Sequence, residues 1–342
     1  MSACGKPTTI ERIIGLFPGP YAAKCLAFAS VFGVPLLLLT RFLDSGNVQN
    51  SLAVFGPLLW QNVVTFSIAN FVLLFYGAYG VRYMRSKIEL TLHDFEPLTQ
   101  ESKKNLQKIF SPVCKLYPAI ILAVLVFAAS LASFPDQTQH ASGSLSLIQV
   151  IISFPFVYLT YGTFVWVYAS SVKSLHELGK QPVLPLSKFY EDPHLRMKPL
   201  GNLSLSLALV YFMGLGLVFF SFISIPVPLE FAVGVLILSG VALFFLPLNV
   251  MHQKMQAEKR KESEKLKIHY RQLAGSSDPL QSIYLTDSKS IRRILAVDII
   301  ERQVASIPEW PFDSRTIKWL SAIVLTVLGS ILTKYVFIFL GL

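Results

Sequence analysis

The chain has 342 residues, of which 53% are hydrophobic and 15% are charged, and its formal net charge is +10. Soluble domains carry about 25% charged residues, so much of this protein must face something other than water. The positive charge does not indicate nucleic-acid binding, because the basic residues alternate with long apolar runs. Three cysteines without CxxC spacing predict neither a disulfide framework nor a zinc site, and no cofactor is expected.

Seven stretches of the chain are long and apolar enough to cross a bilayer as helices. A spanning helix needs about 20 mostly apolar residues, and continuous apolar runs favour helices over the alternating strands of a barrel. The acidic residues lie outside the interiors of these stretches. The predicted spans are Tyr21–Leu43, Leu58–Val81, Leu116–Phe134, Leu147–Ser170, Leu203–Ile223, Leu229–Val250 and Trp319–Phe339. The expected fold class is therefore an all-α, polytopic integral membrane protein.

The basic residues predict the orientation of these spans. Lysines and arginines number two in the tail before the first span, six in the connection 83–115, five in 171–200 and thirteen in 251–318. The other connections, 44–57, 135–146 and 224–228, contain none. Because cytoplasmic connections carry the excess of Lys and Arg, we expect the N-terminus inside, the C-terminus outside, and a location in the cell membrane.

Two short helices are expected outside the spans. Ile10–Phe17 can form an amphipathic helix that lies flat on the membrane, ended by the Pro18-Gly19-Pro20 sequence. Thr99–Ser111 is predicted to form a second helix, with Leu106, Ile109 and Phe110 on one face.

Polar and aromatic residues within the second and fourth spans are candidates for a ligand site. Asn70 lies near the middle of the second span, and an amide in hydrocarbon needs partners. It can line a site or hydrogen-bond between helices. Tyr158 and Tyr161 belong to an aromatic face of the fourth span, which suits an apolar or cationic ligand. The alternative for this face is packing and anchoring at the membrane interface.

The sixth span is expected to continue far into the cytoplasm. No Gly or Pro occurs from Leu248 to Ala274, and the sequence Gly275–Pro279 then ends the helix. A second helix is predicted at about 287–306, with Ile291, Ile294, Leu295 and Ile299 as its apolar stripe. The two helices are expected to pack as an antiparallel hairpin, which includes a basic run at 254–261.

The last span carries a polar stripe that suits a pore. Thr326, Ser330 and Thr333 recur at helical spacing, with the small residues Ala322 and Gly329 beside them. Hydroxyl groups on one face can line water, or they can pack against another helix, as small and hydroxyl-bearing residues commonly do in membranes. Both interpretations remain open. Before this span, Trp310-Pro311-Phe312 is expected to form an elbow at the inner interface, and Asp313 or Ser314 is expected to cap the helix.

Two resemblances follow from these elements. The Glu309–Asp313 elbow and the Pro199–Leu205 segment resemble elements of an uncharacterised prokaryotic multi-pass membrane protein family with a Trp-Pro-Phe-Asp elbow, which implies no particular activity. The seven-span layout, with its extended sixth helix, is similar to the insect odorant and gustatory receptors. That resemblance implies a ligand-gated channel of several subunits lined by the last helix, but their C-terminal motif is not matched here residue by residue.

We therefore expect three parts: a bundle at 1–250, a cytoplasmic hairpin and elbow at 251–315, and a final span at 316–342. The first functional hypothesis is a homo-oligomeric, channel-like or receptor-like protein. The second is a membrane scaffold or sensor that binds a cytoplasmic protein through 251–315, and a small-molecule transporter ranks third. No catalytic or metal-binding constellation is recognised, so an enzyme is not expected. The lipid bilayer and further copies of the chain are the expected partners, and nucleic acid is not.

Overall fold

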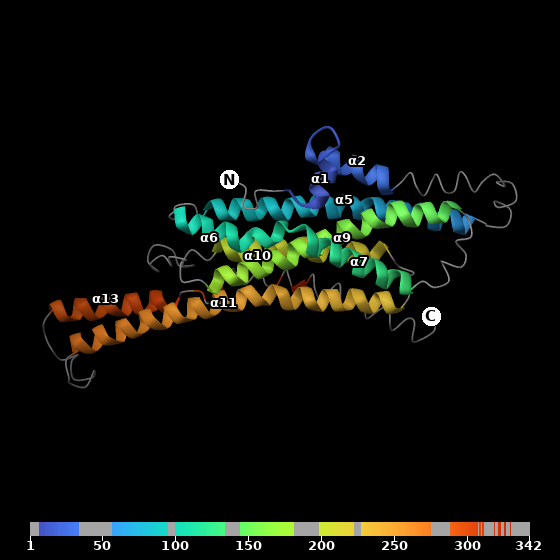
Figure 1. Cartoon of the computed structure of the whole chain (residues 1–342). Helices are drawn as coiled ribbons and strands as arrows, with labels where there is room; N and C mark the ends of the chain where they lie inside the picture. Colours follow the sequence, from blue (N-terminus) through green and yellow to red (C-terminus); the bar gives the residue numbers. More distant parts are fainter. Residues whose placement is uncertain are drawn as a thin grey trace.

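The computed structural model is all-helical throughout the residues that it describes (Figure 1). These are residues 7–33, 57–94, 100–133, 144–180, 198–221, 227–274, 288–306, 308 and 310. Of the last predicted span, only positions 318, 321, 322, 325 and 329 are described, and all five are helical. The fold class predicted from the sequence is confirmed in its coarse form, as an all-helical chain with membrane-length helices.

Long helices lie side by side in a bundle formed by α5 (Pro57–Asp94), α7 (Leu116–Ser133), α9 (Ser144–Lys180), α10 (Lys198–Ser221) and the first part of α11 (Val227–Ala274) (Figure 1). α9 occupies the centre, since it contacts α5, α7, α10 and α11. Pro155 and Pro247 lie inside α9 and α11 without ending them, as is tolerated where neighbouring helices satisfy the freed carbonyls.

Three helices among the described residues are long and apolar enough to cross a membrane. They are Gln107–Leu125, which joins α6 (Gln100–Phe110), the 3₁₀ turn Ser111–Cys114 and α7, then Lys198–Val218 and Val235–His269. A shorter apolar helix, α2 (Tyr21–Gly33), covers the start of the first predicted span. The remainder of that span, and most of the last one, fall outside the described residues.

Two helices run further than the apolar stretches that predicted them. α5 continues to Asp94, thirteen residues past Val81, and α9 continues to Lys180, ten residues past Ser170. No proline interrupts either extension, and the charged and polar residues in them are compatible with helix. The extensions still contribute buried residues to the core, such as Met84 and Ile88 of α5 and Leu175 of α9.

The N-terminal helix α1 (Thr9–Gly15) differs from its predicted position. The side chains of Ile10 and Ile14 are completely buried within the same core as α5 and α9. The apolar face of α1 therefore packs against protein, and the expectation that this helix lies flat on a membrane surface is wrong. The predicted break after it is present, because Gly19 adopts a positive φ of 101° between α1 and α2, a conformation that glycine adopts without strain.

The predicted continuation of a long helix through Ala274, and a second helix packed against it, are confirmed. α11 is one continuous helix that ends at Ala274, and α13 (Ser288–Ala305) packs against it beyond the end of the bundle (Figure 1). At 1.5 Å per residue, the 48 residues of α11 span roughly 70 Å. We call residues 251–274 together with α13 the hairpin.

Two of the four residues of the predicted apolar stripe of α13 have described side chains, and both are exposed. Leu295 and Ile299 are each 54% exposed, whereas Val304 is 3% exposed. The reason is geometric, because Leu295 and Ile299 lie one turn apart on a face that α11 does not cover. The expectation that these two residues bury themselves against α11 is therefore wrong.

The elbow residue Trp310 stacks on His252 of α11, with ring centroids 4.3 Å apart and an interplanar angle of 15°. Trp310 is half-buried and packs against the core of the bundle. This contact anchors the chain after α13 to the point where α11 leaves the bundle. The proposed capping residues Asp313 and Ser314 lie outside the described residues.

Candidate functional site

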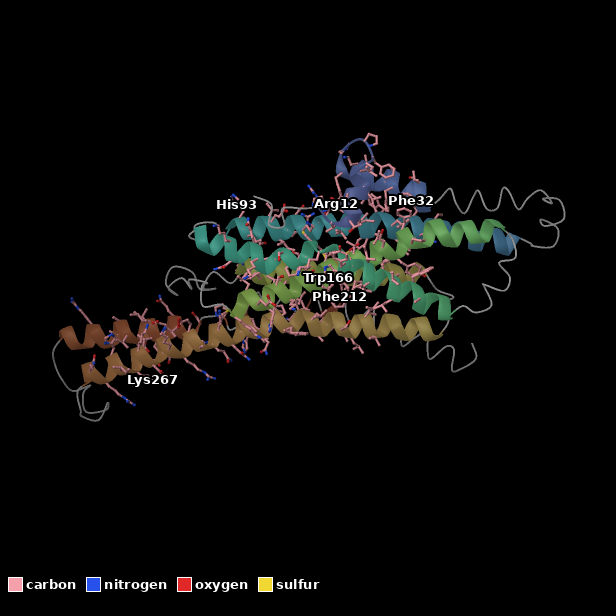
Figure 2. All side chains as sticks on the ribbon, viewed as in Figure 1. Arg12, Phe32, His93, Trp166, Phe212 and Lys267 are labelled. Atoms are coloured by element: carbon pink, nitrogen blue, oxygen red, sulfur yellow. The ribbon has the colours of Figure 1, made fainter. Side chains whose placement is uncertain are left out.

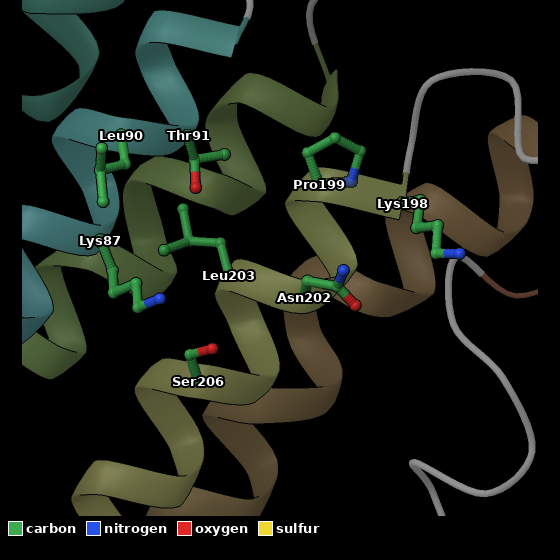
Figure 3. A pocket seen from close by; sticks show the side chains of 8 residues that line it. All are labelled: Lys87, Leu90, Thr91, Lys198, Pro199, Asn202, Leu203 and Ser206. Carbon is green, nitrogen blue, oxygen red and sulfur yellow. The ribbon is translucent and has the colours of Figure 1, made fainter.

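A cavity of about 460 Å³ lies between the end of α5 and the first turns of α10 (Figure 3). It is found at the end of the bundle from which the hairpin projects (Figure 1). The lining residues come only from these two helices and are Lys87, Leu90, Thr91, Lys198, Pro199, Asn202, Leu203 and Ser206. The cavity exists because α5 extends past its apolar stretch, so that its last turns stand beside the start of α10.

The start of α10 is favourable for helix formation at this position. Lys198 is the first helical residue and Pro199 the second, and proline is accepted in the first turn because its missing N–H would have no helical partner there. Leu200 and Leu203 are buried, while Lys198 and Asn202 are exposed. The buried leucines therefore fix the helix against the bundle and leave its polar residues at the cavity.

The cavity is positively charged. Lys87 and Lys198 are its two ionisable lining residues, and no acidic residue lines it. Within the described part of the chain, neither lysine forms an ion pair. Lys87 makes a cation–π contact instead, with its amino group 5.5 Å from the centre of the Tyr83 ring. Thr91, Asn202 and Ser206 add hydroxyl and amide groups, so the cavity presents hydrogen-bond donors and two cations.

Another face of α5 carries a buried ionic cluster that holds α1 in place. Glu11 is 6% exposed and forms an ion pair with Arg85, which is also 6% exposed. The Glu11 carboxylate accepts hydrogen bonds from the Thr8 backbone N–H (2.9 Å) and hydroxyl group (3.0 Å), which completes a capping box at the start of α1. Buried charges require this kind of pairing, because an isolated one is strongly disfavoured in a low-dielectric interior.

Neighbouring residues extend this cluster along α5. Arg82 Nη1 lies 3.6 Å from Glu11 Oε1, and the Arg82 guanidinium lies 5.2 Å from the centre of the Tyr21 ring. On the other side, Arg85 Nη2 lies 3.7 Å from Glu89 Oε1. The cluster therefore connects α1, α2 and α5 at the same end of the bundle as the cavity.

The predicted ligand residues do not form a common site among the described side chains. Asn70 is half-buried on α5 and has no hydrogen bond to any described residue. Tyr158 on α9 packs edge-to-face against Phe127 of α7, with ring centroids 5.3 Å apart. Tyr161 is half-buried on the same helix. No described cavity contains any of the three, so their assignment as ligand residues stays a prediction.

Deeper aromatic residues of the bundle connect its helices. Tyr168 of α9 stacks on Tyr211 of α10, with centroids 4.1 Å apart, and its hydroxyl group donates to the Gly240 carbonyl of α11 at 3.1 Å. Tyr211 donates to the Leu236 carbonyl at 3.1 Å. Figure 2 shows Trp166 and Phe212 among the side chains within the bundle. These contacts join α9, α10 and α11, which agrees with the packing interpretation of this part of the aromatic face.

The predicted pore residues Thr326, Ser330 and Thr333 lie outside the described residues. Four described residues of the same helix show how exposed it is. Ser321, Ala322 and Leu325 are exposed, Leu325 by 67%, and the position beside Gly329 is open, since a Cβ atom there would have no neighbour within 4 Å. At these positions the last helix is therefore largely exposed in the described part of the chain.

From the sequence, Lys87 and Lys198 served only as evidence for which side of the membrane is cytoplasmic, and they were not predicted to line one site. The available signals were the charged, proline-free extension of α5 and the Lys198-Pro199 helix start. The Thr8–Glu11 pair was also readable as a capping box, but its pairing with Arg85, 74 residues away, was not.

Comparisons of the sequence with family models and with curated proteins, and of the fold with solved structures, found no match. The two resemblances stated from the sequence consequently stay predictions.

Proposed function

We propose that this chain is a multi-pass cell-membrane protein with seven spans, its N-terminus and hairpin in the cytoplasm, that works as the subunit of a homo-oligomeric, channel-like receptor. The observation that carries the proposal is the exposure of Ser321, Ala322 and Leu325 among the described positions of the last helix, with open space where a Cβ atom would lie at Gly329. Thr326, Ser330 and Thr333 adjoin these positions in the helical pattern. Small residues let helices of neighbouring subunits approach closely.

The hairpin supports the same proposal. Leu295 and Ile299 of α13 are exposed one turn apart, and Ile268 of α11 is 55% exposed. In an oligomer with a central axis, such a pair of apolar side chains can pack against the hairpin of the neighbouring copy. The subunits would then be held together on the cytoplasmic side while the last helices surround the axis.

Conductance measurements test the pore assignment. The purified full-length chain is reconstituted in planar bilayers, and Ser330→Leu is compared with Leu328→Ile, a volume-conserving change on the same helix. We expect an ionic conductance from the unaltered protein and from Leu328→Ile. Ser330→Leu should abolish or strongly reduce it, because a leucine in a narrow polar lining removes water from the pore. A protein that remains strictly monomeric in mild detergent and shows no conductance would contradict the proposal.

The second candidate is a non-conducting scaffold or sensor in which the 251–315 segment binds a cytoplasmic protein. It is favoured by the same exposed Leu295 and Ile299, which can equally contact a different protein. The double variant Leu295→Lys/Ile299→Lys separates the two functions. If the oligomer dissociates to monomers, the residues join subunits. If the number of subunits in the oligomer is unchanged but the variant no longer binds a purified cytoplasmic protein, the scaffold function is supported.

A further inference from the structure

The cavity between α5 and α10 is lined by two cations, and neither forms an ion pair with a described residue. Lys87 comes from α5 and Lys198 from α10, residues 111 positions apart that the fold brings to one cavity. Arg85, two residues before Lys87 on α5, has ion-pair partners in Glu11 and Glu89. Two like charges around one cavity repel each other, and an anion bound between them would remove that repulsion.

The neutral residues of the cavity match the oxygens of a phosphate group. Figure 3 shows the Lys87 amino group, the Ser206 hydroxyl group and the Asn202 amide around the cavity, and Lys198 at its rim with its amino group directed away from Lys87. A phosphate group accepts several hydrogen bonds at once, and ammonium groups, hydroxyl groups and amides all donate to it. The cavity also lies at the N-terminal end of α10, where the helix dipole favours negative charge.

The apolar part of the lining distinguishes this cavity from a simple anion site. Leu90 from α5 and Pro199 and Leu203 from α10 also line it, and Leu90 is 62% exposed. Its volume of about 460 Å³ exceeds what a phosphate group alone fills and lies within the range of about 300–1,000 Å³ typical of small-molecule sites. In the proposed topology, the cavity lies at the cytoplasmic end of two spans, where basic pockets between helices bind lipid headgroups.

We infer that the α5–α10 cavity binds a phosphate-bearing anion through Lys87 and Lys198, with Asn202 and Ser206 as further donors. The phosphate can belong to the headgroup of an anionic phospholipid, whose glycerol and first acyl carbons would contact Leu90 and Leu203, or to a soluble phosphorylated compound. This binding site requires neither oligomerisation nor ion conduction, so it stands or fails separately from the channel.

Direct binding measurements on the full-length protein in a non-ionic detergent test the inference. The probes are dioctanoyl phosphatidic acid, dioctanoyl phosphatidylcholine, glycerol 3-phosphate and inorganic phosphate, titrated in a calorimeter at low salt. We expect phosphatidic acid, or at least one of the two soluble phosphates, to bind more tightly than phosphatidylcholine. If phosphatidic acid binds and neither soluble phosphate does, the ligand is a headgroup; if glycerol 3-phosphate or inorganic phosphate binds as tightly as the lipid, it is soluble. If phosphatidylcholine binds as tightly as phosphatidic acid, or if none of the three phosphate probes binds, the inference is overturned.

The decisive variant is Lys87→Gln/Lys198→Gln, which removes both charges and keeps a polar, slightly shorter side chain. Its matched control is Lys108→Gln/Lys267→Gln, because both control lysines are exposed, lie away from the cavity and have no ion pair among the described residues. We expect the Kd to rise about tenfold or more in the first variant and less than about twofold in the control. An equal rise in both would show attraction by net charge alone, and would contradict a site at this cavity.

A second variant fills the cavity without changing its charge. Ser206→Phe places a ring into the space that the ligand would occupy, and Ser206 is only half-buried, so the helix can accept the change. Phosphate binding should be lost while the apparent melting temperature of the ligand-free protein stays near that of the unaltered chain. Retained binding in this variant would exclude the cavity as the binding site.

Discussion

The bundle and the hairpin are both helical, but different kinds of contact hold them together. In the bundle, the side chains that connect helices are distant in sequence, as in Arg85 with Glu11 or Tyr168 with the Gly240 carbonyl. In the hairpin, the described ion pairs join residues of a single helix, as in Lys265 with Glu262 and Arg302 with Asp298. Local pairs stabilise a helix only slightly, so the bundle must carry the specificity of the fold.

This difference has a physical origin in the surroundings of each charge. Glu11 and Arg85 are almost completely buried, where an unpaired charge is expensive and a pair must be complete. The side chains of Lys265 and Glu262 are 56% and 30% exposed, so water screens their attraction. An ion pair between a glutamate and a basic residue therefore helps to determine the structure of the bundle but contributes little to the stability of the hairpin. Figure 2 shows this contrast in the hairpin side chains, with Lys267 projecting away from the helices.

The largest effect is expected from breaking the buried pair. Arg85→Met removes the cation and leaves the Glu11 carboxylate buried, with Arg82 3.6 Å from it as the remaining basic neighbour. We expect a loss of about 3–5 kcal/mol in the free energy of unfolding, measured as a large drop in the apparent melting temperature in detergent. In Glu11→Gln/Arg85→Met both charges are gone, so most of the stability should return. If the double variant is no more stable than Arg85→Met, the pair does not hold α1 in the way described.

The next effect concerns helix approach rather than charge. Gly162 of α9 lies against the backbone of α7, and a Cβ atom at this position would stand 2.8 Å from both the Ala119 carbonyl oxygen and the Ala123 amide nitrogen. Backbone atoms cannot move aside as a side chain can, so Gly162→Ala must push the two helices apart. We expect a destabilisation of about 1–3 kcal/mol, read from the same melting measurement.

Gly216 of α10 provides the matched control. A Cβ atom there has no neighbour within 4 Å, and alanine favours a helix over glycine by about 1 kcal/mol. Gly216→Ala should therefore leave the melting temperature unchanged or raise it slightly. If both substitutions lower it equally, the effect comes from helix flexibility and not from the contact between α7 and α9.

The sequence predicted the features of this fold that depend on local pattern. The continuity of α11 through Ala274 followed from the absence of helix breakers, and the bounds of α13 differ from those predicted by about one residue at each end. The start of α7 at Leu116 was also predicted from its apolar run. In each case the determining signal lies within the element itself.

The sequence did not predict which faces of the helices pack against each other, and three features of the structure depend on that. Ile10 and Ile14 are compatible with burial in lipid or in protein, and only the distant partner Arg85 selects protein. Leu295 and Ile299 have the spacing of a packing stripe but lie on the uncovered side of α13. The cavity likewise needs the ends of α5 and α10 to be adjacent, and neither segment contains information about the other. Hydrophobicity determines that a face is covered, but not which element covers it.

The smallest effect completes the comparison from the side of the hairpin. Glu262→Gln removes the carboxylate that lies 2.6 Å from the Lys265 amino group. Because this pair is exposed, we expect a change of no more than about 1 kcal/mol, and that change should vanish in high salt as screening increases. Circular dichroism and the melting temperature at low and high salt measure it. A loss as large as that of Arg85→Met would mean that the hairpin is buried in the assembled protein, for example against the hairpin of a neighbouring subunit. The same variant in detergent of increasing strength would then show whether the effect disappears as the oligomer dissociates.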